Sequence, residues 1–532
     1  FNRKAEYLYQ DAEFLSTRGC MTIKAASYPE DQLHQGWKAI LLNQFHDILP
    51  GSSIKEVYEE SKEQYVELLE KGNDVINGSM EAIAKSISLQ ETSVVVFNQL
   101  GFQRDDLVEF ELPGGFDSVK IVDDNGEVTV PQIRENSGSD DSKHKKAVFI
   151  AKGLPAKGYK AFKLLKHDVP ETNILSEKDN AIAVSKGLLS NSYFDIKLDD
   201  DCNIISIYDK LNGREVLKKG SKANVLQAFE DKPASFDAWD INIYYQEKMW
   251  EISAVESAEV LESGPVSAAL RVKRRFLDSV IEQDIRIYSG IPRIDFINRV
   301  DWKERQILLK ASFPVDIHTD KAAYEIQYGN VERPTHWNTS WDYARFEVCA
   351  HKWADLSEDG YGVSLLNDCK YGYDIKDGVM RLTLIKSAVE PNVDADREIH
   401  EFTYSLYPHP GNWREGGTIG MAYRLNCPVY ARVENAHPGV LPPVFSFFNL
   451  DSENIVAEVV KKAEDSDDII IRLYECYNRR TSACLSFFRK LEEVWECDLM
   501  EKNISRIQPE ENSFRFEIKP YEIKTFKLRI QK

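Results

Sequence analysis

The run Gln44-Phe45-His46-Asp47-Ile48-Leu49-Pro50-Gly51-Ser52-Ser53 is the most informative part of this chain. It follows an apolar segment with helical spacing, residues 37–42, and Pro50 followed by glycine forbids continuation of a helix. The pattern therefore places His46 and Asp47 on the last helical turn, beside a sharp corner. An imidazole next to a carboxylate at such a corner can present a metal ligand or an acid–base group. A bare His-Asp pair is, however, more often incidental.

Around this run, residues 1–90 are predicted to be helical. Candidate helices span 2–18, 31–47 and 54–87, and the last carries apolar residues at helical spacing. Gly72 and Gly78 are expected to interrupt it. The short links between the segments predict antiparallel packing as a three-helix bundle.

Beyond the helices, short β-type runs take over from residue 94. They include 94–97, 107–112, 147–150, 194–198 and 526–530, with turn signals between them. The pattern predicts an α+β chain in which residues 91–532 form a large region of antiparallel β-sandwiches, with a possible subdomain boundary near 430–450. The polar stretch 135–146 is expected to be a mobile loop.

Composition narrows the classes of partner and compartment. The 532 residues are 42% hydrophobic and carry a formal charge of −20, which argues for several real cores and against a nucleic-acid partner. Eight cysteines form no C-x-x-C pair. In so large a chain they fit reduced thiols and predict an intracellular, cytoplasmic location. No apolar run reaches the ~20 residues that a membrane span needs, so no membrane partner is expected.

The run 44–53, with Trp37-Lys38 before it and Ile54 after it, resembles a signature of the family 38 glycoside hydrolases, the class II α-mannosidases. The resemblance covers almost the whole chain. The sequence is more similar to the vacuolar/cytosolic and bacterial branch of the family than to the Golgi branch. Further segments that carry it are Phe229-Glu230-Asp231-Lys232-Pro233, 237–240, Phe313-Pro314, 324–329, 332–336, 346–348, 365–372 and 404–409.

The resemblance implies zinc-dependent, retaining hydrolysis of α-mannosidic linkages in oligosaccharides. It makes His46 a ligand of one Zn²⁺ site, and it gives Asp47 a supporting role in orienting that site. In the family, a (β/α) barrel precedes this motif and carries a His-x-Asp zinc pair and the Asp nucleophile, and we expect no His-x-Asp tripeptide in this chain. Only 45 residues precede His46 here, and the chain opens at Phe1 inside a helical pattern. We therefore expect the C-terminal part of such an enzyme, without the barrel, its zinc pair or its nucleophile, and inactive by itself.

Several polar and aromatic residues in the resembling segments are candidates for substrate binding. A Trp can stack on a pyranose ring while carboxylates accept its hydroxyl groups, and loops after strands often carry binding groups. For these candidates a purely structural interpretation stays open: a surface loop with one buried Trp, or an ordinary polar turn. The candidates are Asp237, Trp239, Asp240, Arg333, His336, Asn367, Asp368 and Tyr371.

Two further alternatives remain at this stage. Asp394, Asp396 and His400 suggest a metal cluster, but a structural hydrogen-bond network is commoner for such residues. The whole chain could also be a noncatalytic carbohydrate-binding or assembly module. The expected partners are α-mannosides or mannose-containing oligosaccharides and the missing barrel, with self-association as a homo-oligomer left open.

Overall fold

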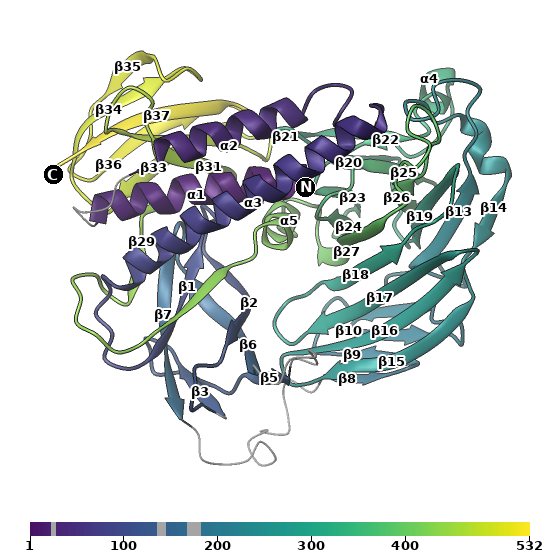
Figure 1. Ribbon diagram of the computed structural model, residues 1–532, viewed down its shortest axis with the longest axis horizontal. Helices are drawn as coiled ribbons and strands as arrows, with labels where there is room; N and C mark the ends of the chain where they lie inside the picture. The colour runs from purple at the N-terminus through teal and green to yellow at the C-terminus, as the bar shows by residue number, and fades with distance from the viewer. Residues whose placement is uncertain (23–27, 117, 136–144, 167–181, 532) are drawn as a thin grey trace. The chain divides into compact units, whose positions relative to one another are not determined.

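The computed structural model describes residues 1–22, 28–116, 118–135, 145–166 and 182–531 (Figure 1). Most of the predicted loop 135–146 therefore lies outside the described residues. The chain divides into two compact units. The first unit comprises Phe1–Lys4, Leu41–Tyr65 and Ser176–Asn426, and the second comprises Ala5–Ile40, Val66–Leu175 and Cys427–Lys532. The predicted domain division at residue 90 stays a prediction.

Three long helices open the chain, as predicted: α1 (Asn2–Thr22), α2 (Glu30–Asn43) and α3 (Lys55–Ala84). The expected interruption of α3 at Gly72 and Gly78 is wrong, because α3 continues through both residues. Gly72 has a packing reason instead. A Cβ atom there would lie 2.7 Å from Leu8 Cδ2, so the missing side chain lets α1 and α3 approach closely.

Contacts along the helices give their directions. The Tyr9 hydroxyl on α1 donates to the Leu68 carbonyl on α3 at 3.1 Å, and Ser16 contacts Ser79 further along both helices. Residue numbers rise together in these pairs, so α1 and α3 run parallel. The order reverses between α1 and α2: Gln44, just after α2, donates to Asn2 Oδ1 at 3.1 Å, whereas Trp37, earlier in α2, meets the Tyr9 ring at a centroid distance of 6.1 Å. Consecutive helices are therefore antiparallel, as short connections predict.

In the first unit, three antiparallel sheets enclose one apolar core to which all of them contribute side chains. Figure 1 shows the neighbouring strands β15 to β18 side by side in teal. The largest sheet has the order β15 (Val255–Ser263), β16 (Ser267–Phe276), β17 (Ser279–Tyr288), β18 (Ile294–Asp301), β27 (Ile399–Pro410), β24 (Tyr361–Asn367), β23 (Trp353–Glu358), β20 (Lys321–Ile326) and β21 (Gly329–Pro334).

The other two sheets of this unit are smaller. One has the order β14 (Met249–Glu251), β13 (Val225–Glu230), β19 (Ile307–Pro314), β26 (Val379–Lys386), β25 (Gly372–Lys376) and β22 (Val348–Cys349). The other has the order β12 (Arg214–Glu215), β11 (Ile204–Asp209), β10 (Phe194–Leu198), β9 (Leu188–Ser190) and β8 (Ala183–Ser185). Short helices lie in the connections: η2 (Ile243–Glu247), α4 (Ser340–Tyr343) and α5 (Thr418–Asn426).

The second unit contains four further antiparallel sheets. Two of them share an apolar core. The first has the order β28 (Tyr430–Glu434), β1 (Ser93–Asn98), β7 (Gly158–Lys166), β3 (Val119–Val122) and β4 (Val128–Thr129), and β29 (Val444–Ser446) also pairs with β7. The second has the order β2 (Arg104–Glu111), β6 (Lys145–Leu154) and β5 (Gln132–Glu135). The other two are β30 (Phe448–Leu450), β33 (Thr481–Phe487) and β36 (Ser513–Ile518), and β31 (Ile455–Lys462), β32 (Ile469–Glu475), β37 (Ile523–Ile530), β34 (Leu491–Cys497) and β35 (Asn503–Ile507).

The predicted fold class is therefore confirmed: helices come first, packed antiparallel sheets follow, and the described residues contain no (β/α) barrel.

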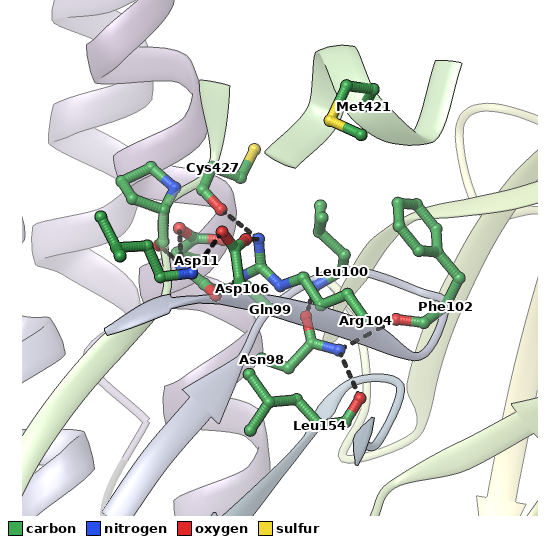
Figure 2. A network of polar contacts seen from close by, with 12 residues as sticks. Asp11, Asn98, Gln99, Leu100, Phe102, Arg104, Asp106, Leu154, Met421 and Cys427 are labelled. Carbon is green, nitrogen blue, oxygen red and sulfur yellow. Dashed lines mark hydrogen bonds and ion pairs between the residues drawn. The ribbon is translucent and has the colours of Figure 1, made fainter. Parts of the chain in front are cut away.

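A buried polar network ties α1 to two other segments of the second unit (Figure 2). The Arg104 guanidinium donates to Asp106 at 2.9 Å, to the Cys427 carbonyl at 2.6 Å and to Gln99 Oε1 at 2.8 Å. Gln99 in turn donates to Asp11 Oδ2 on α1 at 3.4 Å. Arg104 is 1% exposed, so this charge is held by its partners and not by water.

Candidate functional site

The corner after α2 carries the His-Asp motif. The helix ends at Asn43, four residues before the predicted end, so His46 and Asp47 lie in successive turns and not on a helical turn. The amides of Ile48 and Leu49 both bond to the Phe45 carbonyl, at 2.9 and 3.1 Å. Gly51 closes the corner with φ of 89°, a left-handed conformation that favours glycine.

Tyr58 on α3 holds this corner from within. Its hydroxyl donates to the backbone carbonyl of Asp47 at 3.2 Å and accepts from the Ser53 amide at 3.0 Å. The Ser53 hydroxyl donates to the same Asp47 carbonyl at 2.8 Å. Burial raises the pKa of Tyr58, which keeps the hydroxyl protonated at neutral pH. Sequence reasoning missed Tyr58, because no local pattern shows that its hydroxyl reaches back across the corner.

The two motif side chains face solvent together. The side chain of His46 is 71% exposed and that of Asp47 51% exposed, and His46 Nε2 lies 3.2 Å from Asp47 Oδ2. A carboxylate at Nε2 fixes the ring and leaves Nδ1 available as a donor to a metal, an arrangement common beside zinc. The donors fit such a metal in type. They do not complete a site, since the described residues hold no group of three His, Cys, Asp or Glu side chains placed to bind one.

A cavity of about 790 Å³ adjoins the corner within the first unit. Residues 48–51 form one part of its lining, and Ala238 with Lys386 forms another. Lys55 and Tyr58 of α3 also contribute, together with the segment 394–398. The lining thus includes residues that follow the His-Asp motif and one residue, Ala238, of the loop 237–240. The predicted site residues themselves are next to lining residues in the sequence but do not line the cavity: His46, Asp47, Asp237, Trp239 and Asp240.

Asp237 and Trp239 play different parts in that loop. The Asp237 carboxyl is 7% exposed and accepts from the Val389 amide at 2.7 Å. Trp239 is 57% exposed, and Asp240 is also exposed. The loop therefore presents Trp239 and Asp240 to solvent and uses Asp237 to hold itself in place.

The structure groups Asn367, Asp368 and Tyr371 elsewhere, around the start of α1. Arg3 donates to Asn367 Oδ1 at 2.8 Å and lies 4.5 Å from the centre of the Tyr371 ring. Lys4 Nζ lies 3.9 Å from the Asp368 carboxylate. These contacts anchor α1, and none of the three predicted residues lines the cavity.

Arg333 and His336 also lie away from the cavity, near α4. The Arg333 guanidinium stacks over the Tyr324 ring at 4.7 Å, and His336 Nδ1 lies 3.7 Å from the Asp342 carboxylate. Asp342 belongs to the capping box that opens α4. A substrate role for this pair stays a prediction.

The group of Asp394, Asp396 and His400 belongs to a structural hydrogen-bond network. Asp394 is bonded by Arg305 at 3.1 Å and Arg397 at 2.8 Å, and His400 Nε2 lies 2.7 Å from the backbone carbonyl of Asp396. The expectation that the chain has no His-x-Asp tripeptide is wrong. His318-Thr319-Asp320 is one, exposed in the connection between β19 and β20, and it does not line the cavity.

Comparisons with known proteins cover most of the chain. The family profile described as "Glycosyl hydrolases family 38 C-terminal domain" matches residues 189–394. The profile described as "Alpha mannosidase middle domain" matches residues 1–83. A third, "Glycosyl hydrolases family 38 C-terminal beta sandwich domain", matches residues 454–526.

Individual relatives agree with these profiles. Alpha-mannosidase 2C1 of Homo sapiens is 31% identical over 538 residues, which cover 100% of this chain and 48% of that protein. Alpha-mannosidase G of Dictyostelium discoideum is 31% identical over 560 residues, covering 99% of this chain and 50% of that protein. The chain spans about half the length of the curated relatives it matches.

A solved structure shares the fold. The crystal structure of an alpha-mannosidase from Enterococcus faecalis V583 has a TM-score of 0.80 to this chain at 17% sequence identity. The match covers 99% of this chain and 67% of that chain.

Proposed function

Because the chain belongs to glycoside hydrolase family 38, we propose that it supplies part of the active site of a zinc-dependent, retaining α-mannosidase. The observation that carries this proposal is the cavity in the first unit. It joins the corner of the His-Asp motif to the loop that presents Trp239 and Asp240. An imidazole that binds a metal and an aromatic side chain that stacks on a sugar, both beside one cavity, would be the elements that mannoside hydrolysis needs from this part of the protein.

His46 would hold zinc through Nδ1, while Asp47 fixes the imidazole through Nε2 at 3.2 Å. A zinc ion held there would bind sugar hydroxyl groups and favour the distorted ring of the transition state. Tyr58 and Ser53 stabilise the turn that presents the imidazole, since both bond to the Asp47 carbonyl. Trp239 and Asp240 would bind the sugar by stacking and by accepting hydroxyl hydrogen bonds.

The remaining catalytic groups would come from residues outside this chain. A retaining enzyme needs a nucleophile and an acid–base carboxyl group about 5–5.5 Å apart, and the resemblance assigns the nucleophile to a barrel. An apolar surface supports such a partner. Leu41, Leu42 and Phe45 are 61%, 58% and 57% exposed directly beside His46. Large apolar side chains gathered at one place mark a surface that another domain covers.

We also infer an intracellular location with α-mannosides or mannose-containing oligosaccharides as substrates. Five cysteines are free thiols, which suits a reducing compartment: Cys202, Cys349, Cys369, Cys484 and Cys497. Within the described residues, no helix combines the length and the apolarity of a bilayer-spanning segment.

The test is zinc content and hydrolysis of a chromogenic α-mannoside by the protein extended to the length of its relatives. His46→Ala should lose most bound zinc and, with it, turnover, because an imidazole ligand disappears from a site with few ligands. His318→Ala is the matched control, because His318 is an exposed histidine two residues before Asp320, and it should keep both. Full zinc occupancy and normal turnover in His46→Ala would contradict the proposal. Sugar binding without any hydrolysis by the unaltered protein would favour a noncatalytic carbohydrate-binding module.

A further inference from the structure

We propose that residues 231–247 form a rigid aromatic platform that binds the sugar units of an oligosaccharide beyond the mannose being cleaved. The platform consists of Phe236, Trp239 and Tyr244, and Asp237 is its positioning residue. The inference rests on the proposed function for its ligand class, a mannose-containing oligosaccharide. It adds Phe236 and Tyr244 as binding residues and changes the role of Asp237 from ligand to clamp.

The first half of the segment is clamped to the strand ends beside it. Lys386, the last residue of β26, bonds to the buried Asp231 carboxylate. Six residues later the Asp237 carboxylate accepts from the Val389 amide at 2.7 Å, and the Ala238 amide donates to the Glu390 carbonyl at 3.2 Å. These bonds fix the loop to residues about 150 positions away in the sequence.

The turn itself is tight. The amides of Trp239 and Asp240 both donate to the Phe236 carbonyl at 2.8 Å. Phe236 has φ of 56°, a left-handed conformation that is rare for a bulky residue. Such a conformation costs free energy and persists where surrounding bonds impose it.

The second half is anchored by Tyr245 in η2. Its ring is 4% exposed and packs edge-on against Phe229 at 5.2 Å, with the Lys310 ammonium 5.0 Å from its centre. Asn242 caps η2 by accepting from the Tyr244 amide at 3.3 Å. Tyr244 and Tyr245 therefore point to different surroundings, one to solvent and one to the core.

Between these anchors, three large aromatic side chains face water. Phe236 is 75% exposed, Tyr244 66% and Trp239 57%. A loop that is held at both ends and in the middle does not need these rings for its own stability, so they can contact a ligand. An exposed acceptor, the Asp240 carboxylate, lies between Trp239 and Tyr244 in the sequence.

This combination fits a carbohydrate. Pyranose rings offer C–H faces to aromatic rings and hydroxyl groups to carboxylate and amide oxygens. Ala238 in the middle of the platform lines the cavity beside the His46 corner. A chain of sugars whose end lies in that cavity can therefore continue over the platform.

The experiment measures binding of a mannotriose to the 532-residue chain by saturation-transfer NMR and by titration calorimetry. Trp239→Ala, Phe236→Ala and Tyr244→Ala should each weaken binding, by about fivefold for a stacked ring. Tyr208→Ala is the matched control, because Tyr208 is an exposed aromatic residue, 44% exposed, that belongs to β11 and lies outside residues 231–247. Since binding to this chain requires neither zinc nor the nucleophile, the result is independent of the hydrolysis test.

Asp237 is tested by rescue. Asp237→Ala should weaken mannotriose binding as much as the loss of a platform ring, while Asp237→Asn, which keeps an acceptor for the Val389 amide, should restore most of it. Melting temperatures show whether any variant has simply unfolded. Absence of transfer to the sugar protons would overturn the proposal, and so would ring variants that lose no more affinity than Tyr208→Ala. If Asp237→Ala and Asp237→Asn are both folded and bind mannotriose equally well, Asp237 does not position the platform.

Discussion

At the scale of single residues, long-range partners decide what a side chain does. Asp237 beside an aromatic residue looks like a sugar ligand in sequence, yet its bond to the Val389 amide makes it a clamp. Asn367 follows an apolar strand, as binding residues often do, yet Arg3 occupies its side chain. His46 could be predicted, because its motif is contiguous and the corner that exposes it is encoded by the adjacent Pro50 and Gly51.

Two buried carboxyl groups on α1 predict a dependence of stability on pH. Burial raises the pKa of Asp11 to about 6 and that of Glu13 to about 7. Asp11 accepts from the Tyr430 hydroxyl at 3.0 Å, beside the network of Figure 2. The folded state keeps both protons at pH values where the unfolded chain has lost them. Their stabilising contribution is therefore present below about pH 4 and is lost as pH rises through 6 to 7.

The measurement is urea unfolding from pH 4 to pH 7. The double variant Asp11→Asn with Glu13→Gln should lose less free energy of unfolding over this range than the unaltered chain, by about 2–3 kcal/mol per group. Glu70→Gln, which alters an exposed carboxyl group on α3, should leave the slope unchanged. Parallel pH curves for the double variant and the unaltered chain would show that these groups are not desolvated.

At the scale of elements, the apolar periodicity predicts where helices and strands lie better than it predicts where they end. The three helices and the strands β1, β2, β6, β10 and β37 lie where the apolar patterns predict them. The end of α2 was missed because Gln44 and Phe45 bond to carbonyls three residues back, at 3.3 and 3.2 Å, which tightens the chain into turns before Pro50. Nothing in the local sequence distinguishes these turns from one more helical turn.

Replacing two of the helical glycines by alanine should change the free energy of unfolding in opposite directions. A Cβ atom at Gly36 on α2 would lie 1.8 Å from Tyr9 Cε1, and Tyr9 is held by its bond to the Leu68 carbonyl. Gly36→Ala should therefore lower the free energy of unfolding, by roughly 1–3 kcal/mol, despite the better helix propensity of Ala. Gly78 on α3 has no atom within 4 Å of such a Cβ, so Gly78→Ala should raise it by roughly 0.5–1 kcal/mol. Thermal melting of both variants checks the sign, and a stabilising Gly36→Ala would contradict the close packing of α1 on α2.

At the scale of the whole molecule, the sequence predicted the order of architectures but not how strands pair. The change from a period of 3.6 to short β runs near residue 90 indicates helices followed by sheets. It does not indicate that β1 pairs with β28, more than 300 residues later, or that β18 pairs with β27. Such pairings depend on long-range contacts that no local pattern records. The cavity beside the His46 corner could not be predicted for the same reason, because its lining comes from five separated parts of the chain: 1–2, 43–65, 238, 303 and 386–398.

The last prediction concerns the 532-residue chain alone. We expect it to fold, because both units contain apolar cores of their own, and to show no turnover of a chromogenic α-mannoside, since the nucleophile and further zinc ligands would lie outside it. Hydrogen exchange should be faster in residues 1–90 than in the sheets. Leu41, Leu42 and Phe45 lie exposed there, and helices with an uncovered apolar surface open more readily than strands packed on both faces. Mass spectrometry after a pulse of deuterium measures this peptide by peptide. Zinc-dependent turnover by the purified chain would mean that the catalytic carboxyl groups lie within these residues. Equal protection of helices and sheets from exchange would mean that the exposed apolar surface does not lower the stability of the helices.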